Sequence, residues 1–359
     1  MALDLGIFMP VANNGWIMSP SAPADPPTFA LNRWVAEEAE RSGFHFLLAQ
    51  SVWRGHGGQT QFWDISLEGF TLMSALAAVT SRIGLVASCQ PLLYPAPVAA
   101  KMVATADEIS AGRFGVNIVA GGNLSEAEQM GMLLQDWGSI RYDYAAEWME
   151  VVRSLWEKER TTYQGQWISV EDCVSGPKPL QTPHPPIIAA GASAKGRAFA
   201  SRFATHAFIG AKDIEALGRV SQEYKASAHE QGRKLKTYTT LYCHIVDSEE
   251  AGTAYRQQFV DDPDLGAVAD LIRQYSRKGA GESLKKETEY NPGDHVFFGD
   301  LLAGTPEQIA ERLRALAGQG LDGVLLHFAE WATDLPRFAS EVRPLAPEIF
   351  SSPTSDWRV

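Results

Sequence analysis

The sequence of 359 residues has few cysteines, no long apolar run and no block of basic residues. Its three cysteines, Cys89, Cys173 and Cys243, are far apart and odd in number. This argues against a disulfide framework and favours a reducing compartment. Every apolar run is well short of the roughly 18 residues that a membrane span needs. No basic segment precedes the first apolar run, so we expect a cytoplasmic protein with no membrane anchor and no secretory signal.

The charge balance excludes further classes of protein. The formal net charge is −12, and no basic cluster is present to meet a phosphate backbone, so we expect no nucleic-acid partner. Paired cysteines and a His-Glu-x-x-His motif are both lacking, and we expect no metal site. A hydrophobic fraction of 45% with 21% charged residues is ordinary for a globular protein and excludes a disordered chain.

Short apolar runs alternate with amphipathic segments along the whole chain. Eight strands, each followed by a helix, are the pattern of a (β/α)8 TIM barrel, whose active site lies at the C-terminal ends of the strands. A doubly wound sheet is the alternative, weakened because no Gly-x-Gly-x-x-Gly turn follows the first strand. The expected strands are residues 3–9, 44–49, 83–88, 114–120, 186–190, 207–209, 237–246 and 323–328. The expected helices are residues 29–42, 67–80, 97–110, 141–156, 193–203, 214–231, 305–318 and 331–342.

Three long connections hold the residues that a barrel does not need. They are residues 120–140, 161–185 and 247–304, and the second carries a hairpin signal at residues 163–167. We therefore expect one barrel domain over residues 1–359, with long insertions at its C-terminal face. The stretch 247–304 is largely polar, and we expect it to lack regular structure. It is either a surface excursion or a lid over the active site.

Two short motifs at the expected C-terminal face suit a phosphate group. Arg141 and Tyr142 open a helix after a long loop, and a guanidinium beside a hydroxyl suits an oxyanion. Ser193 lies among small residues where the fifth strand leads into its helix, and such a helix start binds anions. The alternatives are a surface ion pair for Arg141 and a simple helix cap for Ser193.

Three residues at or beside the fourth expected strand have distinct expected roles. Gly112 is placed to end the preceding helix, and Arg113 can fasten the bottom of the barrel. Asn117 lies inside the strand, where a buried amide must find partners. It either bonds a ligand at the barrel mouth or is satisfied within the core.

Together these motifs resemble the bacterial luciferase-like family of flavin-dependent monooxygenases, and most closely its pyrimidine monooxygenase branch. The resemblance extends over nearly all of residues 5–347. The motifs that carry it are Asn13-Asn14-Gly15-Trp16, Arg54-Gly55-His56-Gly57-Gly58, Phe62-Trp63-Asp64, residues 77–83, residues 110–117, Glu128-Gln129-Met130-Gly131 and residues 141–144.

The resemblance implies a barrel that holds FMN at its C-terminal mouth. The implied cofactor contacts are Ser51, Val52, Asn117, Glu126, Arg141, Tyr142 and Ser193, of which the last three lie near the phosphate. Leu48, Ser88 and Asn117 match positions that line the oxygen side of the flavin. Leu48, Phe8 and Trp63 are expected to form apolar walls that exclude water, although ordinary core packing is the alternative.

The resemblance also implies a two-component reaction. A separate NAD(P)H-dependent flavin reductase supplies reduced FMN, O2 is the co-substrate, and a small nitrogen- or sulfur-containing compound, expected to be a heterocycle, is oxygenated. A homo-oligomer, either a dimer or a tetramer, is expected by the same likeness. Two further functions stay open: hydride transfer with a deazaflavin on the same barrel, and flavin binding without catalysis.

The sequence departs from the pyrimidine branch near the expected substrate. Gly122 replaces a bulky aromatic residue, His56 replaces an aromatic one, and residues 88–94 depart from the branch's Thr- and Ala-rich pattern. The substrate pocket is therefore expected to differ, and Gly122 enlarges it. With an ordinary pKa near 6.5, His56 can serve as a general acid or base, unless it is an exposed loop residue.

Overall fold

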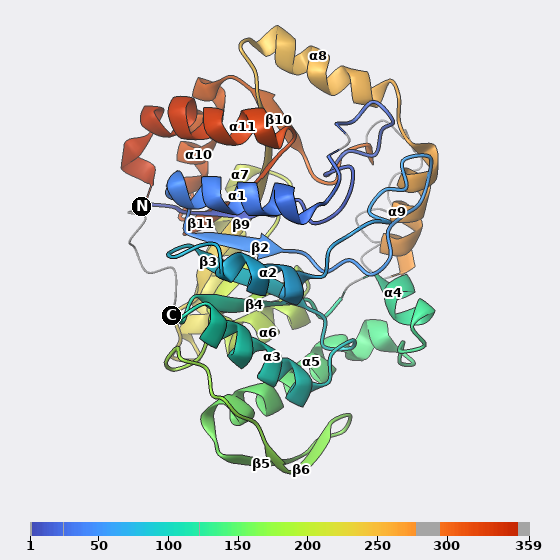
Figure 1. Ribbon diagram of the computed structural model, residues 1–359, viewed down its shortest axis with the longest axis vertical. Coiled ribbons are helices and arrows are strands. Elements are labelled where there is room, and N and C mark those ends of the chain that lie inside the picture. Colours follow the sequence, from blue (N-terminus) through green and yellow to red (C-terminus); the bar gives the residue numbers. More distant parts are fainter. Residues whose placement is uncertain (1, 24, 122, 278–294, 351–359) are drawn as a thin grey trace.

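A closed barrel of eight parallel strands forms the centre of the molecule (Figure 1). The structure is a computed structural model that describes residues 2–23, 25–121, 123–277 and 295–350. Each strand pairs in parallel with its neighbours, and the pairing of β8 with β9 closes the ring. The predicted (β/α)8 barrel is therefore confirmed. Its strands are β1 (Asp4–Phe8), β2 (Phe46–Ala49), β3 (Gly84–Cys89), β4 (Phe114–Ile118), β7 (Ile187–Ala190), β8 (His206–Phe208), β9 (Lys236–Ile245) and β11 (Gly323–Phe328).

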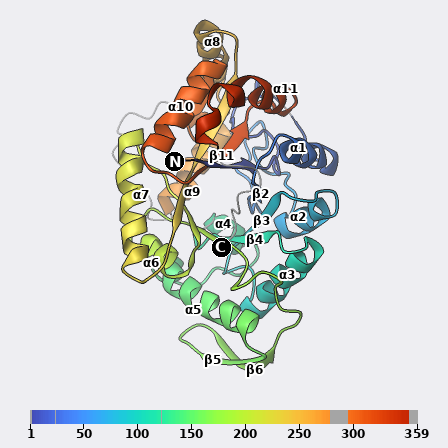
Figure 2. The same cartoon turned by 90° about the vertical axis from the view of Figure 1, so that its left-hand side faces the viewer.

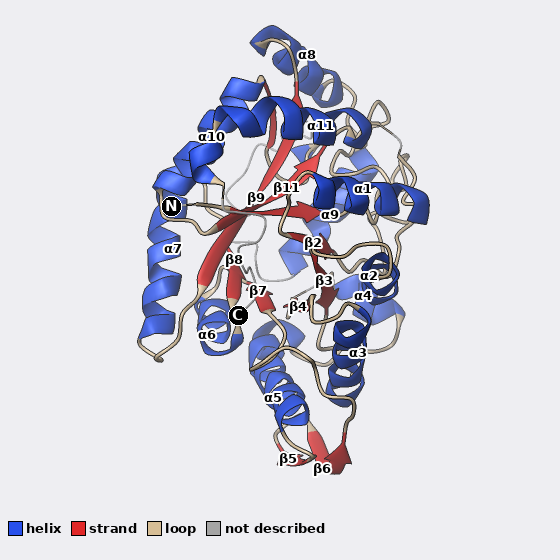
Figure 3. Cartoon of the chain, turned by 60° about the vertical axis from the view of Figure 1, so that its left-hand side comes forward, coloured by secondary structure: helices blue, strands red, loops and turns tan. Residues whose placement is uncertain are grey.

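The helices that follow these strands form the outer layer. Figure 2 looks along the barrel and shows them around the ring, and Figure 3 separates the inner strands from the outer helices. They are α1 (Phe29–Arg41), α2 (Gly69–Ala77), α3 (Ala96–Ile109), α5 (Trp137–Glu157), α6 (Ala194–Phe203), α7 (Ile214–His229), α10 (Pro306–Gly318) and α11 (Trp331–Arg337). Within the described residues, no helix has the length and apolar character of a membrane span.

Side-chain caps fix where several of these helices begin. The side chains of Thr28, Ser193 and Asp213 each accept a hydrogen bond from a backbone N–H in the first turn of the helix that follows. Thr305 and Gln308 form a capping box at the start of α10. Each cap satisfies a backbone donor that the helix itself leaves without a partner.

Arg113 fastens the N-terminal end of the barrel, as predicted. Its guanidinium donates to the carbonyl oxygens of Ala77, Thr80, Ile83 and Ser110 at 2.7–3.1 Å. One buried side chain thereby joins the end of α2, the start of β3 and the end of α3. Gly112, at a φ of 78°, supplies the left-handed turn that ends α3.

The expectation that residues 247–304 lack regular structure is wrong for their described part. They form α8 (Glu249–Val260), α9 (Leu265–Arg277) and β10 (Leu301–Gly304), and residues 278–294 lie outside the described residues. Strand β10 extends the sheet by pairing with the C-terminal part of β9. The physical reason for α9 is burial, because Ala267, Val268 and Leu271 pack against apolar residues from the N-terminal loop.

The other two long connections also contain short elements. The predicted hairpin forms as β5 (Arg160–Gln164) and β6 (Ser169–Val174), which pair antiparallel. The connection after β4 contains α4 (Leu124–Gln129), beside α9 (Figure 1). Helix α5 begins at Trp137 rather than at Arg141, so Arg141 and Tyr142 lie in its second turn and do not open the helix.

The barrel interior is filled by apolar side chains. Phe46, Leu48, Val86, Ile188, Tyr238 and Leu325 pack together there. Because side chains alternate along a strand, Ser88 and His327, two residues beyond Val86 and Leu325, also face inward, nearer the C-terminal mouth. The apolar core thus ends below a layer of polar groups at the mouth.

Candidate active site

The centre of the candidate site is Asn117 on β4. It lies opposite Ser88 on β3, and its Nδ2 atom donates to the Ser88 hydroxyl at 2.9 Å. Asn117 is only 6% exposed, and its Oδ1 atom is buried with no hydrogen-bond partner in the described part of the chain. A buried amide oxygen without a partner is costly, so a ligand donor at the mouth would stabilise it.

Leu48 lies in the same inward-facing part of the barrel, two strands from Asn117. It is buried within the interior cluster, and its neighbour in register on β3 is Val86. Leu48, Ser88 and Asn117 thus come from three consecutive strands, β2, β3 and β4. The structure brings together the three residues predicted for the oxygen side of a flavin.

Glu126 joins the loop after β2 to the end of β3. Its carboxylate accepts from the backbone N–H of Trp53 and from the side-chain amide of Gln90, both at 2.8 Å. Glu126 is 2% exposed, so these bonds lie out of bulk water. The Ser51 hydroxyl accepts from the Trp53 indole at 3.0 Å. The Val52 carbonyl accepts from Ser66 at 2.9 Å. Ser51 is thus held by Trp53, which Glu126 fixes, and Val52 by Ser66.

The residues predicted for a phosphate meet at the N-terminus of α6. A Cβ at Gly191 would collide with the Tyr142 hydroxyl, and one at Gly196 would lie 2.7 Å from it. Ser193, between these two glycines, caps α6 by accepting from the Gly196 N–H at 3.1 Å. The hydroxyl of Tyr142 therefore lies against a glycine-lined helix start, where backbone N–H groups and the helix dipole favour an anion.

Arg141 lies beside this helix start. Its Cζ atom is 5.2 Å from the centre of the Tyr142 ring. A Cβ at Gly121, in the loop after β4, would lie 3.4 Å from the Arg141 side chain. Arg141 therefore passes close to the backbone that follows Asn117, which connects the phosphate-type cluster with the centre of the mouth.

An aromatic wall covers the other side of the mouth. His327 stacks on Trp16 with ring centres 4.4 Å apart, and Phe8 meets Trp16 edge to face at 4.9 Å. Trp63 meets Phe298 at 4.7 Å, and its indole donates to the carbonyl of Gly15 at 2.7 Å. A cavity of about 430 Å³ lies against Phe8, Trp16 and Phe298, within the size range of small-molecule sites.

His327 is a site residue that the sequence analysis missed. Full burial lowers its pKa to about 3, so the imidazole is neutral at physiological pH. Its Nδ1 atom lies 3.0 Å from the carbonyl oxygen of Phe8 and therefore carries the proton that this bond needs. Its Nε2 atom is a buried acceptor without a partner among the described residues. The only signal in the sequence was a histidine within an apolar strand run.

His56 is buried rather than exposed. Its Nδ1 atom lies 3.1 Å from a carboxylate oxygen of Asp270 on α9, and its ring packs near Phe62 and Trp63. Burial would raise the pKa of Asp270, but hydrogen bonds from Arg273, His56 and Gln274 outweigh it and lower that pKa. The exposed-loop alternative is therefore wrong. A role as a general acid or base stays a prediction.

A second contact also holds α9 on the loop after β2. The Asp264 carboxylate, before the start of α9, accepts from the backbone N–H and the hydroxyl of Thr60, both at 2.7 Å. The same carboxylate accepts from the N–H groups of Gly266 and Ala267 at 3.1 Å. The described part of the 247–304 stretch thus docks on the rim of the mouth. Gly122, the other predicted departure, lies outside the described residues.

The arrangement fits a phosphorylated flavin. The unpartnered Oδ1 of Asn117 offers an acceptor to a ligand N–H at the mouth, and the Gly191–Gly196 cradle with Tyr142 and Arg141 suits a phosphate. The aromatic wall supplies an apolar surface for a ring system. No group of three or more His, Cys, Asp or Glu side chains that could hold a metal ion occurs in the described ranges.

Comparisons with known proteins place the chain in a family. Residues 3–323 match the model of the luciferase-like monooxygenases. Pyrimidine monooxygenase RutA of Pseudomonas syringae pv. syringae is 36% identical over 349 residues, 96% of each chain. The enzyme of that name from Cronobacter turicensis is 34% identical, over 96% of this chain and 92% of its own.

Solved structures share the fold at lower identity. A riboflavin lyase, solved with modified FMN and riboflavin, superposes with a TM-score of 0.84 at 21% identity, covering 98% of this chain and 93% of its own. EDTA monooxygenase of Chelativorans sp. gives a TM-score of 0.83 at 19% identity, covering 99% and 96%. The family model and the curated relatives identify an enzyme of the flavin-dependent monooxygenase class. The chain belongs to the luciferase-like monooxygenase family.

Proposed function

We propose that this protein is a two-component monooxygenase that uses reduced FMN and O2 to oxygenate a small nitrogen- or sulfur-containing heterocycle. The observation that carries the proposal is the unpartnered, buried Oδ1 of Asn117 at a barrel mouth that also contains the glycine cradle of α6. When bound, reduced FMN supplies the reaction with O2. The relatives named as pyrimidine monooxygenases support a pyrimidine-like substrate.

The chain's own residues would have three roles in this proposal. Arg141, Tyr142 and Ser193 bind the phosphate, while Glu126 holds Ser51 and Val52 against the flavin. Asn117, oriented by Ser88, accepts a hydrogen bond from the ring system. Leu48 and the aromatic residues Phe8, Trp16 and Trp63 keep water from the reacting centre, which limits unproductive loss of reduced flavin.

We further propose that the chain works as one barrel domain in which α9 covers the mouth. Two buried or half-buried carboxylates, Asp264 and Asp270, hold α9 on the loop after β2, which supports this role. His56 contacts α9 directly, so it links this cover to the substrate side of the site.

The same proposal includes a separate NAD(P)H-dependent reductase as the source of reduced flavin, a homo-oligomer, and a cytoplasmic location.

The test is oxygen transfer in a reconstituted system. The protein is combined with FMN, NADH, a generic flavin reductase and a panel of uracil, thymine and other heterocycles under ¹⁸O2, with catalase present. We expect a product that needs the reductase and carries one ¹⁸O atom. The proposal fails if turnover proceeds without O2 using a reduced deazaflavin, or if the product takes its oxygen from water alone. Flavin binding without any O2 consumption would favour the non-catalytic alternative.

A further inference from the structure

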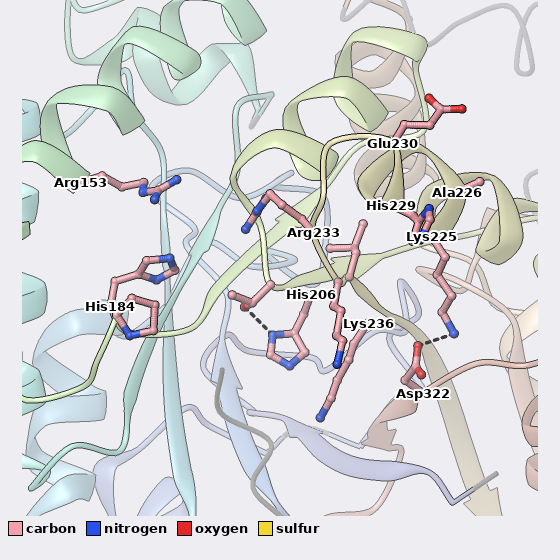
Figure 4. A pocket seen from close by; sticks show the side chains of 14 residues that line it. Arg153, His184, His206, Lys225, Ala226, His229, Glu230, Arg233, Lys236 and Asp322 are labelled. Atoms are coloured by element: carbon pink, nitrogen blue, oxygen red, sulfur yellow. Dashed lines mark hydrogen bonds and ion pairs between the residues drawn. The ribbon is translucent and has the colours of Figure 1, made fainter.

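A second cavity lies at the opposite end of the barrel from the mouth. It has a volume of about 1030 Å³ and borders the N-terminal ends of β8 and β9 and the segment before β7 (Figure 4). Cavities of this size accommodate organic ligands rather than single ions. Catalytic groups of TIM barrels lie at the C-terminal face, so this cavity is separate from the proposed active site.

Basic side chains from different elements face this cavity. Arg153 comes from α5, His184 precedes β7, His206 lies on β8 and Arg233 precedes β9 (Figure 4). His184 and His206 are 4% and 1% exposed, and the His206 Nδ1 atom lies 2.7 Å from the Thr205 hydroxyl. Such a cluster is unexpected in a chain whose formal net charge is −12.

In the described ranges, neither arginine has a short contact with a carboxylate. Arg233 donates to the carbonyl oxygens of Ser201 and Phe203, at 2.9 and 3.3 Å, and these are neutral acceptors. Arg153 has a single long ion pair, 3.5 Å from the half-exposed Glu157. The Nε atom of Arg153 is buried and has no hydrogen-bond partner among the residues that the structure describes.

Apart from Glu157, the acidic residues that the structure describes near the cavity are engaged elsewhere or point away. Asp322 pairs with Lys225 at 2.7 Å, and Lys236 pairs with Asp4 at 2.9 Å. Glu230 extends away from Arg153 and His184 (Figure 4). Among the described residues, the charge of Arg153 is therefore only weakly compensated, and Arg233 meets neutral acceptors.

The positive groups also act on one another. Burial and then the charge of Arg153 lower the pKa of Arg233. Burial, followed by the charges of Arg153 and Arg233, lowers the pKa of His184, although the Pro185 carbonyl opposes this. Groups that repel one another at short range gain most from a ligand that carries more than one negative charge.

We propose that this basal cavity binds an organic phosphate monoester, with its phosphate between Arg153 and Arg233 and its organic part against the apolar lining. A phosphate monoester carries about −1.5 to −2 charges at neutral pH and matches two guanidinium forks, whereas a single carboxylate matches one. The volume leaves room for a sugar or base beyond the phosphate. This site is independent of the function proposed for the mouth.

The test is calorimetric titration of the full chain, loaded with one equivalent of FMN per chain to fill the mouth, with adenosine 5′-monophosphate, ribose 5-phosphate and adenosine. Both phosphate esters are expected to bind at one site per chain. Each should bind at least about tenfold more tightly than adenosine, because a charge-assisted hydrogen bond contributes about this much to affinity. Arg153→Gln and Arg233→Gln should each weaken binding of the esters by about tenfold. Arg160→Gln is the matched control. Arg160 pairs with exposed Asp172 on the hairpin, away from the cavity lining, so this variant should leave binding unchanged.

Two further measurements distinguish loss of the basal site from unfolding and from binding at the mouth. Arg233 also binds carbonyls at the end of α6, so its variant is checked for folding, and Arg153→Gln carries the test if that variant unfolds. Repeating the titration without FMN separates the basal cavity from the mouth and should leave the affinity of the cavity for the esters unchanged. The proposal is overturned if the esters bind no better than adenosine, if both cavity variants bind like the wild type, or if the esters bind only when FMN is left out.

Discussion

The Nδ2 atom of Asn117 donates to the hydroxyl of Ser88 across neighbouring strands at 2.9 Å, and Oδ1 of the same amide has no partner in the described part of the chain. The serine thus holds the donor side of the amide and leaves its acceptor oxygen available to a ligand. Ser88 on β3 thus positions the side chain of Asn117 on the neighbouring strand β4.

From this pair we expect substitutions of Asn117 and Ser88 to weaken FMN binding to different extents. Asn117→Ala removes the acceptor and should weaken FMN binding about five- to tenfold, the equivalent of one hydrogen bond. Ser88→Ala leaves the acceptor in place and should cost less, because only its orientation is lost. Fluorescence titration with FMN measures both. Wild-type affinity in Asn117→Ala would refute the assigned contact.

We expect a side chain at position 191 to disturb the phosphate cradle. A Cβ at this position would collide with the Tyr142 hydroxyl, so Gly191→Ala should displace Tyr142 and weaken FMN binding. The additional substitution Tyr142→Phe should relieve part of the collision and recover protein stability, though not the hydroxyl's contact with phosphate. Affinity and thermal unfolding are measured on the same samples.

Gly138→Ala is the matched control for this prediction. Gly138 lies on α5, the helix of Tyr142, and a Cβ there would meet nothing within 4 Å. Because alanine is the better helix former, this variant should be more stable by about 0.5–1 kcal/mol with unchanged FMN affinity. Equal loss of affinity in both variants would show that the helix, not the cradle, is being disturbed.

If the contact between His56 and Asp270 holds α9 in place, removing it should make α9 more mobile. His56→Gln should loosen α9 and raise the hydrogen-exchange rates of its amides about fivefold or more, as expected for the loss of about 1 kcal/mol of local stability. Arg33→Gln, which removes an exposed ion pair on α1, serves as the control and should leave α9 unchanged. Unaltered exchange in His56→Gln would mean that this contact does not hold α9.

His327 predicts a pH dependence of stability. Its pKa is about 3 when folded and has its ordinary value of 6.5 when unfolded, so the unfolded chain binds the extra proton between these values. The free energy of unfolding should therefore fall as the pH drops from about 6.5 toward 3, by at most about 1.4 kcal/mol per pH unit from this group. Urea unfolding at several pH values should show a shallower slope in His327→Gln. Identical slopes would contradict the buried, neutral state.

Part of this architecture could be predicted from the sequence alone. The continuous apolar runs indicate strands buried on both faces, and the polar Asn117 within one of them marks the mouth. Arg141, Tyr142 and Ser193 could be grouped because successive strands of a barrel end at the same face.

The remaining features depend on contacts between distant segments. His56 meets Asp270 across 214 positions of the chain, and His327 meets the Phe8 carbonyl across 319, so no local pattern specifies either contact. Helix α9 did have a local signal, since Val268 and Leu271 recur at helical spacing, but the polar residues around them obscured it. The basal cavity is formed by four elements and has no continuous motif.

The central claim, a mouth that binds FMN through its phosphate, is tested most directly by comparing FMN with riboflavin in wild-type protein and Arg141→Ala. Loss of a charge-assisted contact should weaken FMN binding by about 10- to 100-fold and leave riboflavin binding nearly unchanged. Equal losses for FMN and riboflavin, or unchanged affinity for FMN, would contradict the account.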